Sequence, residues 1–396
     1  MKVMLSILGE GRGHMTQAIA AKEIVERAGH KVVSVVAGAG RTREIPTYFS
    51  QAMRLPIEKI PTLDFSFRDN RKVDLLATAG AVLRRLPEYI RAVRRVATVV
   101  RETRPDIILN FFEPITGLYA LFAWKRPPVL AIAHQFMYGH RSYVRAPGLR
   151  FQQSVMKWFV RLVGARSARL ALSFYEAADV PRKKTWVCPP ILRRGIFDIQ
   201  ADLNGRFVLV YLLNHGYADQ IIQWHKAHPE TVLHCFFDKP GAPPELSYDD
   251  TLTFHRLDGE KFLRMMAQCR YVVCTAGFES LAEAAYFGKP LFLVPVENHV
   301  EQQINAIDAT NIGWAVNDTW FNLDRLRELP ARLPNAVFKA WLAKAPSILL
   351  TAIETAVAGH KAPHESQPGN AIAGRATKPE HPSVTPDREA HAPSAA

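Results

Sequence analysis

Residues 274–306 constrain the fold of this chain more than any other stretch. An apolar strand leads into the small turn Ala276-Gly277, which opens a helix that carries Glu283 one turn beyond its start, and a second apolar strand follows. A helix N-terminus leaves backbone N–H groups unpaired and carries a partial positive charge, so such a turn is a ready site for phosphate. Because Glu283 is placed to reach an attached ribose, the segment predicts a nucleoside diphosphate site, although strand–turn–helix units also occur in α/β folds without one.

Strands and helices alternate on both sides of an interruption around 186–205. The strands are runs of Val, Ile and Leu without period-two alternation, which is typical of parallel strands covered on both faces. The interruption contains Cys188-Pro189-Pro190, and the same alternation restarts after it. Two such halves predict an α/β chain of two Rossmann-like domains that bind ligands in a cleft between them.

The predicted elements define the domain limits. We expect strands over 3–8, 31–36, 106–111, 129–133, 207–213, 231–237, 252–255, 271–275 and 291–296, and helices over 15–28, 118–124, 217–228, 259–268, 278–287 and 299–311. The domains are expected at 1–190 and 203–335, with a closing helix at 336–358. Residues 360–396 are rich in Ala, Pro, Ser, His and Gly, so we expect a disordered tail.

The composition bears on the expected cellular location and partners of the chain. No run of about 18 apolar residues exists, so we expect no membrane span. The four cysteines have no metal-ligand spacing and are expected to be buried, reduced thiols of a cytoplasmic protein. Residues 1–185 hold 31 Lys and Arg against 14 Asp and Glu, while the rest holds 19 against 23. The basic half is either a solvated surface or a site for an anionic partner.

A glycine-rich loop, Gly9-Glu10-Gly11-Arg12-Gly13-His14, follows the first strand and opens a helix. A dinucleotide fingerprint would have a third glycine where His14 stands, and an acidic residue at the end of the second strand, near Arg41. NADP binding is therefore weakened but stays open, because Arg41 can face a 2′-phosphate.

The segment 274–306 resembles the donor-binding half of GT-B glycosyltransferases, in the group of the bacterial lipid-intermediate N-acetylglucosaminyl transferase and the UDP-glycosyltransferases. The resemblance implies that the turn and helix start hold the diphosphate, Glu283 the ribose, and Glu301 with Gln302 the donor sugar. Ala276 departs from the family pattern, in which many members have a second glycine. The residues so assigned to the donor are Asn214, Arg256, Leu257, Gly277, Phe278, Glu279, Ser280, Glu283, Glu301 and Gln302.

The resemblance also assigns an acceptor side, which agrees best with a little-characterised microbial branch of the family. Gly11, Gly13 and Gln135 fall in acceptor-side loops, and His14 is the candidate base because its ordinary pKa suits proton transfer near neutral pH. His14 capping its helix is the alternative. Glu113 and His134 follow later strands and are further candidates for the base.

The resemblance implies an inverting glycosyltransferase that needs no metal or other cofactor and uses a UDP-sugar as co-substrate. The acceptor is a hydroxyl, with a lipid at the cytoplasmic membrane face as one candidate. The helix over 88–104, with five arginines, and the segment 158–169 are a candidate surface for anionic lipid, or else a solvated basic face. A nucleic-acid partner is not expected, since no stacking motif accompanies the arginines. A UDP-sugar 2-epimerase and a non-catalytic sugar-nucleotide or lipid-binding protein remain alternatives.

Overall fold

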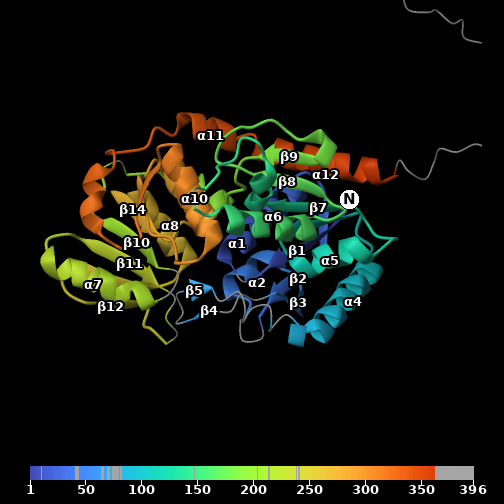
Figure 1. Ribbon diagram of the computed structural model, residues 1–396, viewed down its shortest axis with the longest axis horizontal. Coiled ribbons are helices and arrows are strands. Elements are labelled where there is room, and N and C mark those ends of the chain that lie inside the picture. The colour runs from blue at the N-terminus through green and yellow to red at the C-terminus, as the bar shows by residue number, and fades with distance from the viewer. Residues whose placement is uncertain are drawn as a thin grey trace, which may run out of the picture.

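The computed structural model describes residues 1–361 except 10, 41–43, 64–66, 69–71, 74–79, 81–82, 147, 203, 213–214, 238 and 240. In this part of the chain two α/β domains each contain a seven-stranded sheet with helices packed against it (Figure 1). A small separate sheet pairs β4 (Phe67–Arg68) with β5 (Lys72–Val73). The predicted α/β class and its two Rossmann-like sheets are confirmed.

The first sheet has the strand order β3-β2-β1-β6-β7-β8-β9, and all neighbouring strands are parallel. Its strands are β1 (Lys2–Leu8), β2 (Lys31–Ala39), β3 (Ile57–Pro61), β6 (Ile107–Phe111), β7 (Val129–Ala133), β8 (Ala168–Leu172) and β9 (Thr185–Cys188). Every residue of β6 and β7 is buried, as their unbroken apolar runs predict. The strand order reverses between β1 and β6, so ligands are expected beyond the carboxyl ends of these two strands.

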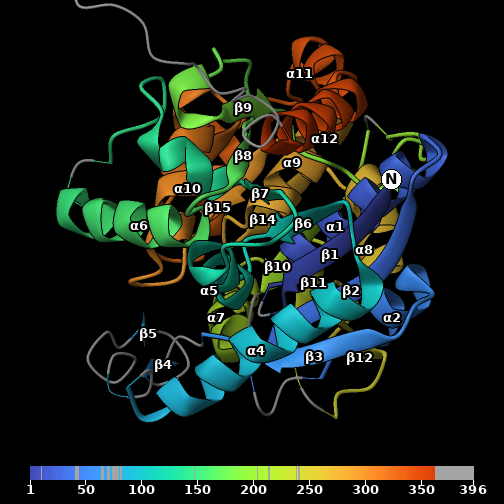
Figure 2. The same ribbon diagram turned by 90° about the vertical axis from the view of Figure 1, so that its right-hand side faces the viewer.

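The helices of the first domain are α1 (Arg12–Arg27), α2 (Thr47–Met53), α4 (Leu86–Thr103), α5 (Pro114–Phe122) and α6 (Arg150–Val163). The sequence patterns did not predict α6, β8 or β9. α5 and α6 pack closely at Gly117, where a Cβ atom would lie 2.7 Å from the carbonyl oxygen of Val163. Figure 2 shows α6 at the edge of the molecule, beyond α5.

The second sheet has the order β12-β13-β11-β10-β14-β15-β16, and its six strands from β13 to β16 repeat the topology of β3 to β8 in the first sheet. Its strands are β10 (Val208–Leu212), β11 (Leu233–Phe237), β12 (Glu245–Ser247), β13 (Leu252–Arg256), β14 (Tyr271–Cys274), β15 (Leu291–Leu293) and β16 (Ala315–Asn317), and only the edge pair of β12 and β13 is antiparallel among these. Its helices are α7 (Ala218–Ala227), α8 (Gly259–Gln268), α9 (Phe278–Phe287) and α10 (Val300–Asn311). The four cysteines are buried and unpaired, as predicted.

The predicted closing helix is two helices, α11 (Ala336–Leu342) and α12 (Ala345–Lys361). Pro346 has no N–H for the carbonyl of Leu342, which accounts for the break between them. α12 returns to the first domain and contacts β7, β8 and β9 (Figure 1). Just before it, the indole Nε1 of Trp341 donates to the carbonyl of Ser173 at 3.0 Å. The end of the chain therefore ties the two domains together.

By length and composition alone, the stretch 336–360 is apolar enough to cross a membrane. In the folded chain, however, Leu349, Ala352 and Ile353 are buried in the core. Packing against the first sheet covers part of this stretch, of whose most apolar window 39% is buried. Most of the tail predicted at 360–396 lies outside the described residues.

Short 3₁₀ helices complete the described elements: η1 (His134–Gly139), η2 (Pro181–Lys183), η3 (Arg194–Ile196), η4 (His215–Tyr217) and η5 (Leu323–Glu328). η1 matters most for the site, because it begins directly after β7 and carries two of the predicted residues, His134 and Gln135. The strand direction thus delivers these side chains to the carboxyl edge of the first sheet.

Candidate active site between the two domains

The predicted phosphate turn lies at the carboxyl end of β14 and leads directly into α9. Ala276 adopts the left-handed backbone conformation, with φ of 62°, which disfavours any residue other than glycine and larger side chains most. Gly277 is the N-cap of α9 and supplies no side-chain hydrogen bond to the first N–H groups of the helix. Nδ2 of Asn305 donates to the carbonyl of Ala276 at 3.1 Å and fixes the turn. The start of α9 is therefore suited to an anion, as at other phosphate-binding helix N-termini.

Glu279, in the first turn of α9, points across the domain interface towards α1. Nε2 of Gln17 donates to its Oε1 at 2.5 Å, and a Cβ atom at Gly13 would lie 3.1 Å from its Cγ. Burial raises the pKa of Glu279 to about 8. The carboxyl group is therefore largely protonated at neutral pH and does not oppose an anion at the helix N-terminus.

The buried carboxyl group of Glu279 predicts a pH-dependent stability. Its folded-state pKa is raised, so the folded protein binds more protons than the unfolded chain, and stability falls as pH rises from about 4.5 to about 8. The loss attributable to this group is at most about 5 kcal/mol. We expect Glu279→Gln, which resembles the protonated acid, to remove this part of the decline in urea unfolding at pH 5 and pH 8.

Glu113 also makes stability decline as pH rises, because burial raises its pKa to about 7. This contribution is the same in wild type and in Glu279→Gln. The comparison between wild type and Glu279→Gln therefore isolates Glu279. Glu260→Gln is the matched control, since the Glu260 side chain is 87% exposed. An unchanged difference in stability between the two pH values for Glu279→Gln would refute the assignment.

Glu283, predicted to bind the ribose, lies one helical turn further along α9 and is buried. Its Oε1 accepts from Nε of Arg193 at 2.9 Å and lies 2.8 Å from Nη2 of the same guanidinium. Arg193 also donates from Nη1 to the carbonyl of Gly259 at 3.2 Å. The second carboxylate oxygen, Oε2, takes part in neither contact with Arg193. The interdomain segment therefore holds Glu283 in one orientation, and sequence patterns gave no signal for Arg193.

The two domains meet at a cluster of polar residues, which we call the His14 cluster: His14, His134 and Gln135 from the first domain and Glu301 from the second. Nε2 of Gln135 donates to Oε2 of Glu301 at 3.0 Å, and Nε2 of His134 lies 3.4 Å from Oε1 of Glu301. The His134 ring stacks on Phe278, with centroids 4.4 Å apart and planes at 7°. The His14 cluster therefore lies against the first residue of the helix that begins at the phosphate turn.

The protonation states in the His14 cluster follow from burial. Burial lowers the pKa of His134 to about 4 and lowers that of His14, although Glu301 acts in the opposite direction on both. Burial raises the pKa of Glu301, but His134, His299 and His14 together with the Gln135 amide outweigh it, and the pKa lies below its ordinary value. At neutral pH both imidazoles are neutral and Glu301 is ionised. The His134–Glu301 contact is thus not a salt bridge at this pH.

Several buried polar atoms at this interface have no hydrogen-bond partner among the described residues. They are Nδ1 of His14, Oε1 of Gln17, Nε2 of His134, Oε1 of Gln135, the Tyr138 hydroxyl, Oε2 of Glu279 and Oδ1 of Asn305. Leaving such groups unpaired is costly, so their concentration at one place indicates a site for a polar ligand. Gln17 and Tyr138 were not predicted as site residues. An isolated Gln on a helix and a Tyr after a strand carry no distinguishing pattern.

Glu113 has a different setting from the His14 cluster. It is the N-cap of α5: its Oε2 accepts from the backbone N–H of Thr116 at 2.6 Å, and its Oε1 accepts from the Thr62 hydroxyl at 2.8 Å. Gly38 must be glycine here, because a Cβ atom would lie 2.6 Å from Oε1. The carboxyl group is completely buried. Its hydrogen bonds join the residue after β3 to the start of α5, and this structural role is the alternative to its predicted role as the base.

The remaining predicted residues lie at the ends of strands or in the elements that follow them, and their contacts differ. Phe278 is stacked between His134 and Phe174, so any contact with a diphosphate has to come from its backbone N–H. Gln302 uses its Oε1 to accept from the backbone N–H of Val296 at 2.9 Å and so braces the loop after β15. Gly11 is the N-cap of α1. Ser280 and Leu257 are half-buried, Arg256 is exposed at the end of β13, and Asn214 lies outside the described residues.

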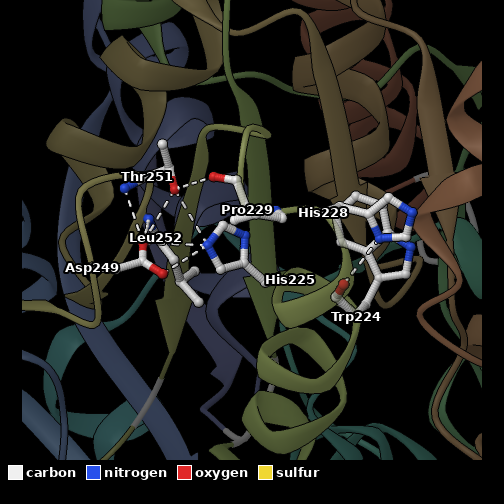
Figure 3. A network of polar contacts seen from close by, with 7 residues as sticks. All are labelled: Trp224, His225, His228, Pro229, Asp249, Thr251 and Leu252. Carbon is white, nitrogen blue, oxygen red and sulfur yellow. Dashed lines mark hydrogen bonds and ion pairs between the residues drawn. The ribbon is translucent and has the colours of Figure 1, made fainter.

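A second polar network lies at the opposite, amino-terminal edge of the second sheet (Figure 3). Nε2 of His225 contacts Asp249 at 3.0 Å and the Thr251 hydroxyl at 3.3 Å. A nucleophile–base–acid relay would need the carboxylate on the other ring nitrogen. Asp249 instead accepts from the backbone N–H groups of Thr251 and Leu252, so the network holds the turn before β13.

Comparison with known proteins identifies the family of this chain. Residues 1–334 match the family described as Glycosyl transferase family 1. The chain belongs to this family. Curated relatives include uncharacterized glycosyltransferases of Methanosarcina acetivorans, 21% identical, and Methanosarcina mazei, 22% identical; the matches cover 79% and 77% of this chain and 82% of each relative.

Solved glycosyltransferase structures share the fold. The kitacinnamycin glycosyltransferase superposes with a TM-score of 0.56 and 18% identity, over 91% of this chain and 98% of that one. The calicheamicin glycosyltransferase CalG4 superposes with a TM-score of 0.53 and 15% identity, over 91% and 99%. The GT-B fold predicted from the sequence is thus confirmed. The narrower resemblance to the lipid-intermediate N-acetylglucosaminyl transferase stays a prediction.

Proposed function

We propose that this family member transfers a sugar from a UDP-sugar to a hydroxyl acceptor, with inversion at the anomeric carbon. The observation that carries the proposal is the stack of His134 on Phe278, which brings the His14 cluster against the start of α9. A neutral imidazole and a helix N-terminus suited to a diphosphate then flank one site. This pairing is what an in-line displacement of a nucleoside diphosphate requires.

In the proposed reaction the acceptor oxygen forms a bond to the anomeric carbon while the bond from that carbon to the diphosphate oxygen breaks. His14 takes the acceptor proton, because its neutral imidazole has a buried, unpartnered Nδ1. The departing diphosphate gains negative charge, which the N–H groups at the start of α9 stabilise. We propose no metal or other cofactor in this step, since the helix N-terminus supplies the positive potential.

Glu301 and Gln302 are proposed to contact the donor sugar. In the described structure Glu301 already binds Gln135, so the sugar has to share or displace this bond. If Glu301 exchanges its hydrogen bond with Gln135 for one with the sugar, donor binding changes a contact between the two domains. We also propose a lipid as the acceptor, at the cytoplasmic face of a membrane, supported by the basic character of residues 1–185.

The donor nucleotide is the first part of the proposal to test. The spinosyn rhamnosyltransferase SpnG, whose structure in complex with thymidine diphosphate superposes with a TM-score of 0.50, makes thymidine nucleotides the alternative to uridine nucleotides. Thermal shift with UDP, thymidine diphosphate and their sugars should show the largest rise for a UDP-sugar. A larger rise with the thymidine series would refute the uridine assignment and leave the reaction type intact.

Acceptor dependence separates the transferase from the alternatives. The transferase should release UDP from the selected UDP-sugar only when a hydroxyl acceptor, such as a lipid extract, is added. A 2-epimerase would give UDP and an altered sugar without any acceptor, and a non-catalytic binding protein would bind the donor without consuming it. NADP oxidation or reduction is monitored in the same samples by absorbance at the nicotinamide band, where no change is expected.

A further inference from the structure

We infer that the outer face of α6, together with the end of α5, docks on an anionic lipid bilayer. Phe151 and Trp158 on this face are 75% and 71% exposed, and Val155 between them is 46% exposed. Their spacing places all three on one side of the helix, opposite the buried Val160 and Val163. We call Phe151, Val155 and Trp158, with Phe122 at the end of α5 and Trp124 after it, the α6 surface.

Phe122 and Trp124 lie next to the end of α6. Phe122 is 69% exposed and Trp124 is 88% exposed. The guanidinium of Arg166, just after α6, lies over the Trp124 ring at 5.3 Å and donates to the carbonyl of Leu121 at 3.0 Å. Exposed aromatic rings beside basic side chains are typical of helices that lie in the interface of a membrane.

Charge selects the kind of membrane. Residues 114–175, which span α5, η1, α6 and β8, contain nine Lys and Arg and no Asp or Glu. Several of these cations, Arg141, Arg145, Arg150 and Arg161, are exposed, and Arg161 lies over the Trp158 ring. A protein partner of ordinary surface would leave this positive field unmatched, whereas anionic headgroups match it while the rings enter the acyl boundary.

The α6 surface is also connected to the proposed active site. Phe159, on the inner side of α6, packs edge-on against Phe112 with centroids 5.8 Å apart, and Phe112 stacks on His14 at 5.9 Å. Phe159 and Phe112 therefore link the inner side of α6 to His14. The inference rests on the proposed function only in taking the acceptor to be a lipid.

The α6 surface contains Trp158 of the predicted segment 158–169 but none of the predicted basic helix over 88–104, which is α4. In α4, Arg95 is engaged by Glu58 through two contacts of 2.8 Å, and Glu88 and Glu102 add negative charge on the same helix. α4 thus has a mixed charge. The α6 surface combines large exposed rings with positive charge and has no acidic residue in its segment.

Vesicle sedimentation of the full chain tests the inference. We expect binding to vesicles of phosphatidylcholine with phosphatidylglycerol, and much weaker binding to phosphatidylcholine alone. The double variant Phe151→Ser/Trp158→Ser should reduce partitioning at least about tenfold. Trp320→Ser/Val337→Ser is the matched control, since these exposed side chains lie outside the α6 surface, and it should bind like wild type.

A third variant, Arg91→Gln/Arg94→Gln on α4, decides between the two helices. Binding that survives in the α6 variant but is lost in the α4 variant would overturn the inference, as would equal binding to both vesicle types. Circular dichroism checks that each variant is folded. Sedimentation needs no donor, so absence of vesicle binding would refute the membrane inference and leave the proposed transferase activity untouched. Absent turnover together with normal sedimentation would refute only the proposed transferase activity.

Discussion

Replacing His14 by alanine should lower turnover by about 10²- to 10⁴-fold, the usual contribution of a positioned general base. The physical reason is the environment of the ring: His14 is held neutral by burial, and its Nδ1 has no partner among the described residues. Since the imidazole takes a proton only in the transition state, donor affinity should change little. Steady-state kinetics and titration with UDP separate the two quantities.

The pH profile gives this prediction an independent readout. The pKa of His14 lies below its ordinary 6.5, so the neutral form is present at pH 7 and is lost as pH falls through the lowered pKa. Wild-type kcat/KM should therefore decline on the acid side, and His14→Ala should lose that dependence. Normal turnover in His14→Ala would disprove the assignment. His134→Ala is the comparison for the alternative base.

Glu283→Gln should weaken binding of the donor by about 10- to 100-fold, with a smaller change in turnover. A hydrogen bond from a ligand hydroxyl to a buried carboxylate contributes about 1.5–3 kcal/mol, and this one is expected in ground state and transition state alike. Competition by UDP against the donor, together with the donor KM, measures the effect. The predicted contact is specific to the ribose hydroxyls.

A nucleotide lacking those hydroxyls provides the control. Dideoxy-UDP should bind wild type as weakly as UDP binds Glu283→Gln, and the variant should no longer distinguish the two nucleotides. Arg193→Gln tests whether loss of the ion pair with Glu283 is enough to weaken donor binding. Of the two carboxylate oxygens of Glu283, Arg193 contacts Oε1. Equal discrimination between UDP and dideoxy-UDP in wild type and in Glu283→Gln would contradict ribose binding by Glu283.

The secondary structure of the second domain was largely predictable, because local information decides it. The strands over 271–275 and 252–255 and the helices over 259–268, 278–287 and 299–311 all correspond to observed elements with small shifts at their ends. The strand over 271–275 is an apolar run, and α9 ends at Gly288, which adopts the left-handed C-cap. α6 was not predicted, although its apolar residues recur with the period of a helix.

The structure brings some of the predicted site residues together. The turn at 276–277 and the segments that carry His14, His134 and Glu301 each follow a predicted strand. A parallel sheet brings the carboxyl ends of its strands to one edge, so their positions could be predicted. The partners of these residues were not predictable. Gln17 bonds Glu279 across 262 residues of sequence, and Gln135 bonds Glu301 across 166. Glu113 stays a predicted candidate base, and its capping of α5 is a contact that the sequence patterns did not predict.

The sequence by itself determined that residues 274–306 form a strand, a small turn and a helix suited to a diphosphate, because the chemistry of that turn is local. Only the tertiary structure decided which side chains face it. Packing of α1 against α9 buries Glu279 and raises its pKa to about 8, which removes a negative charge from the helix N-terminus. The stack of His134 on Phe278 joins the two domains at the same place. Burial sets the charge of Glu279, and long-range contacts set the position of His134. Neither can be predicted from one segment of the sequence.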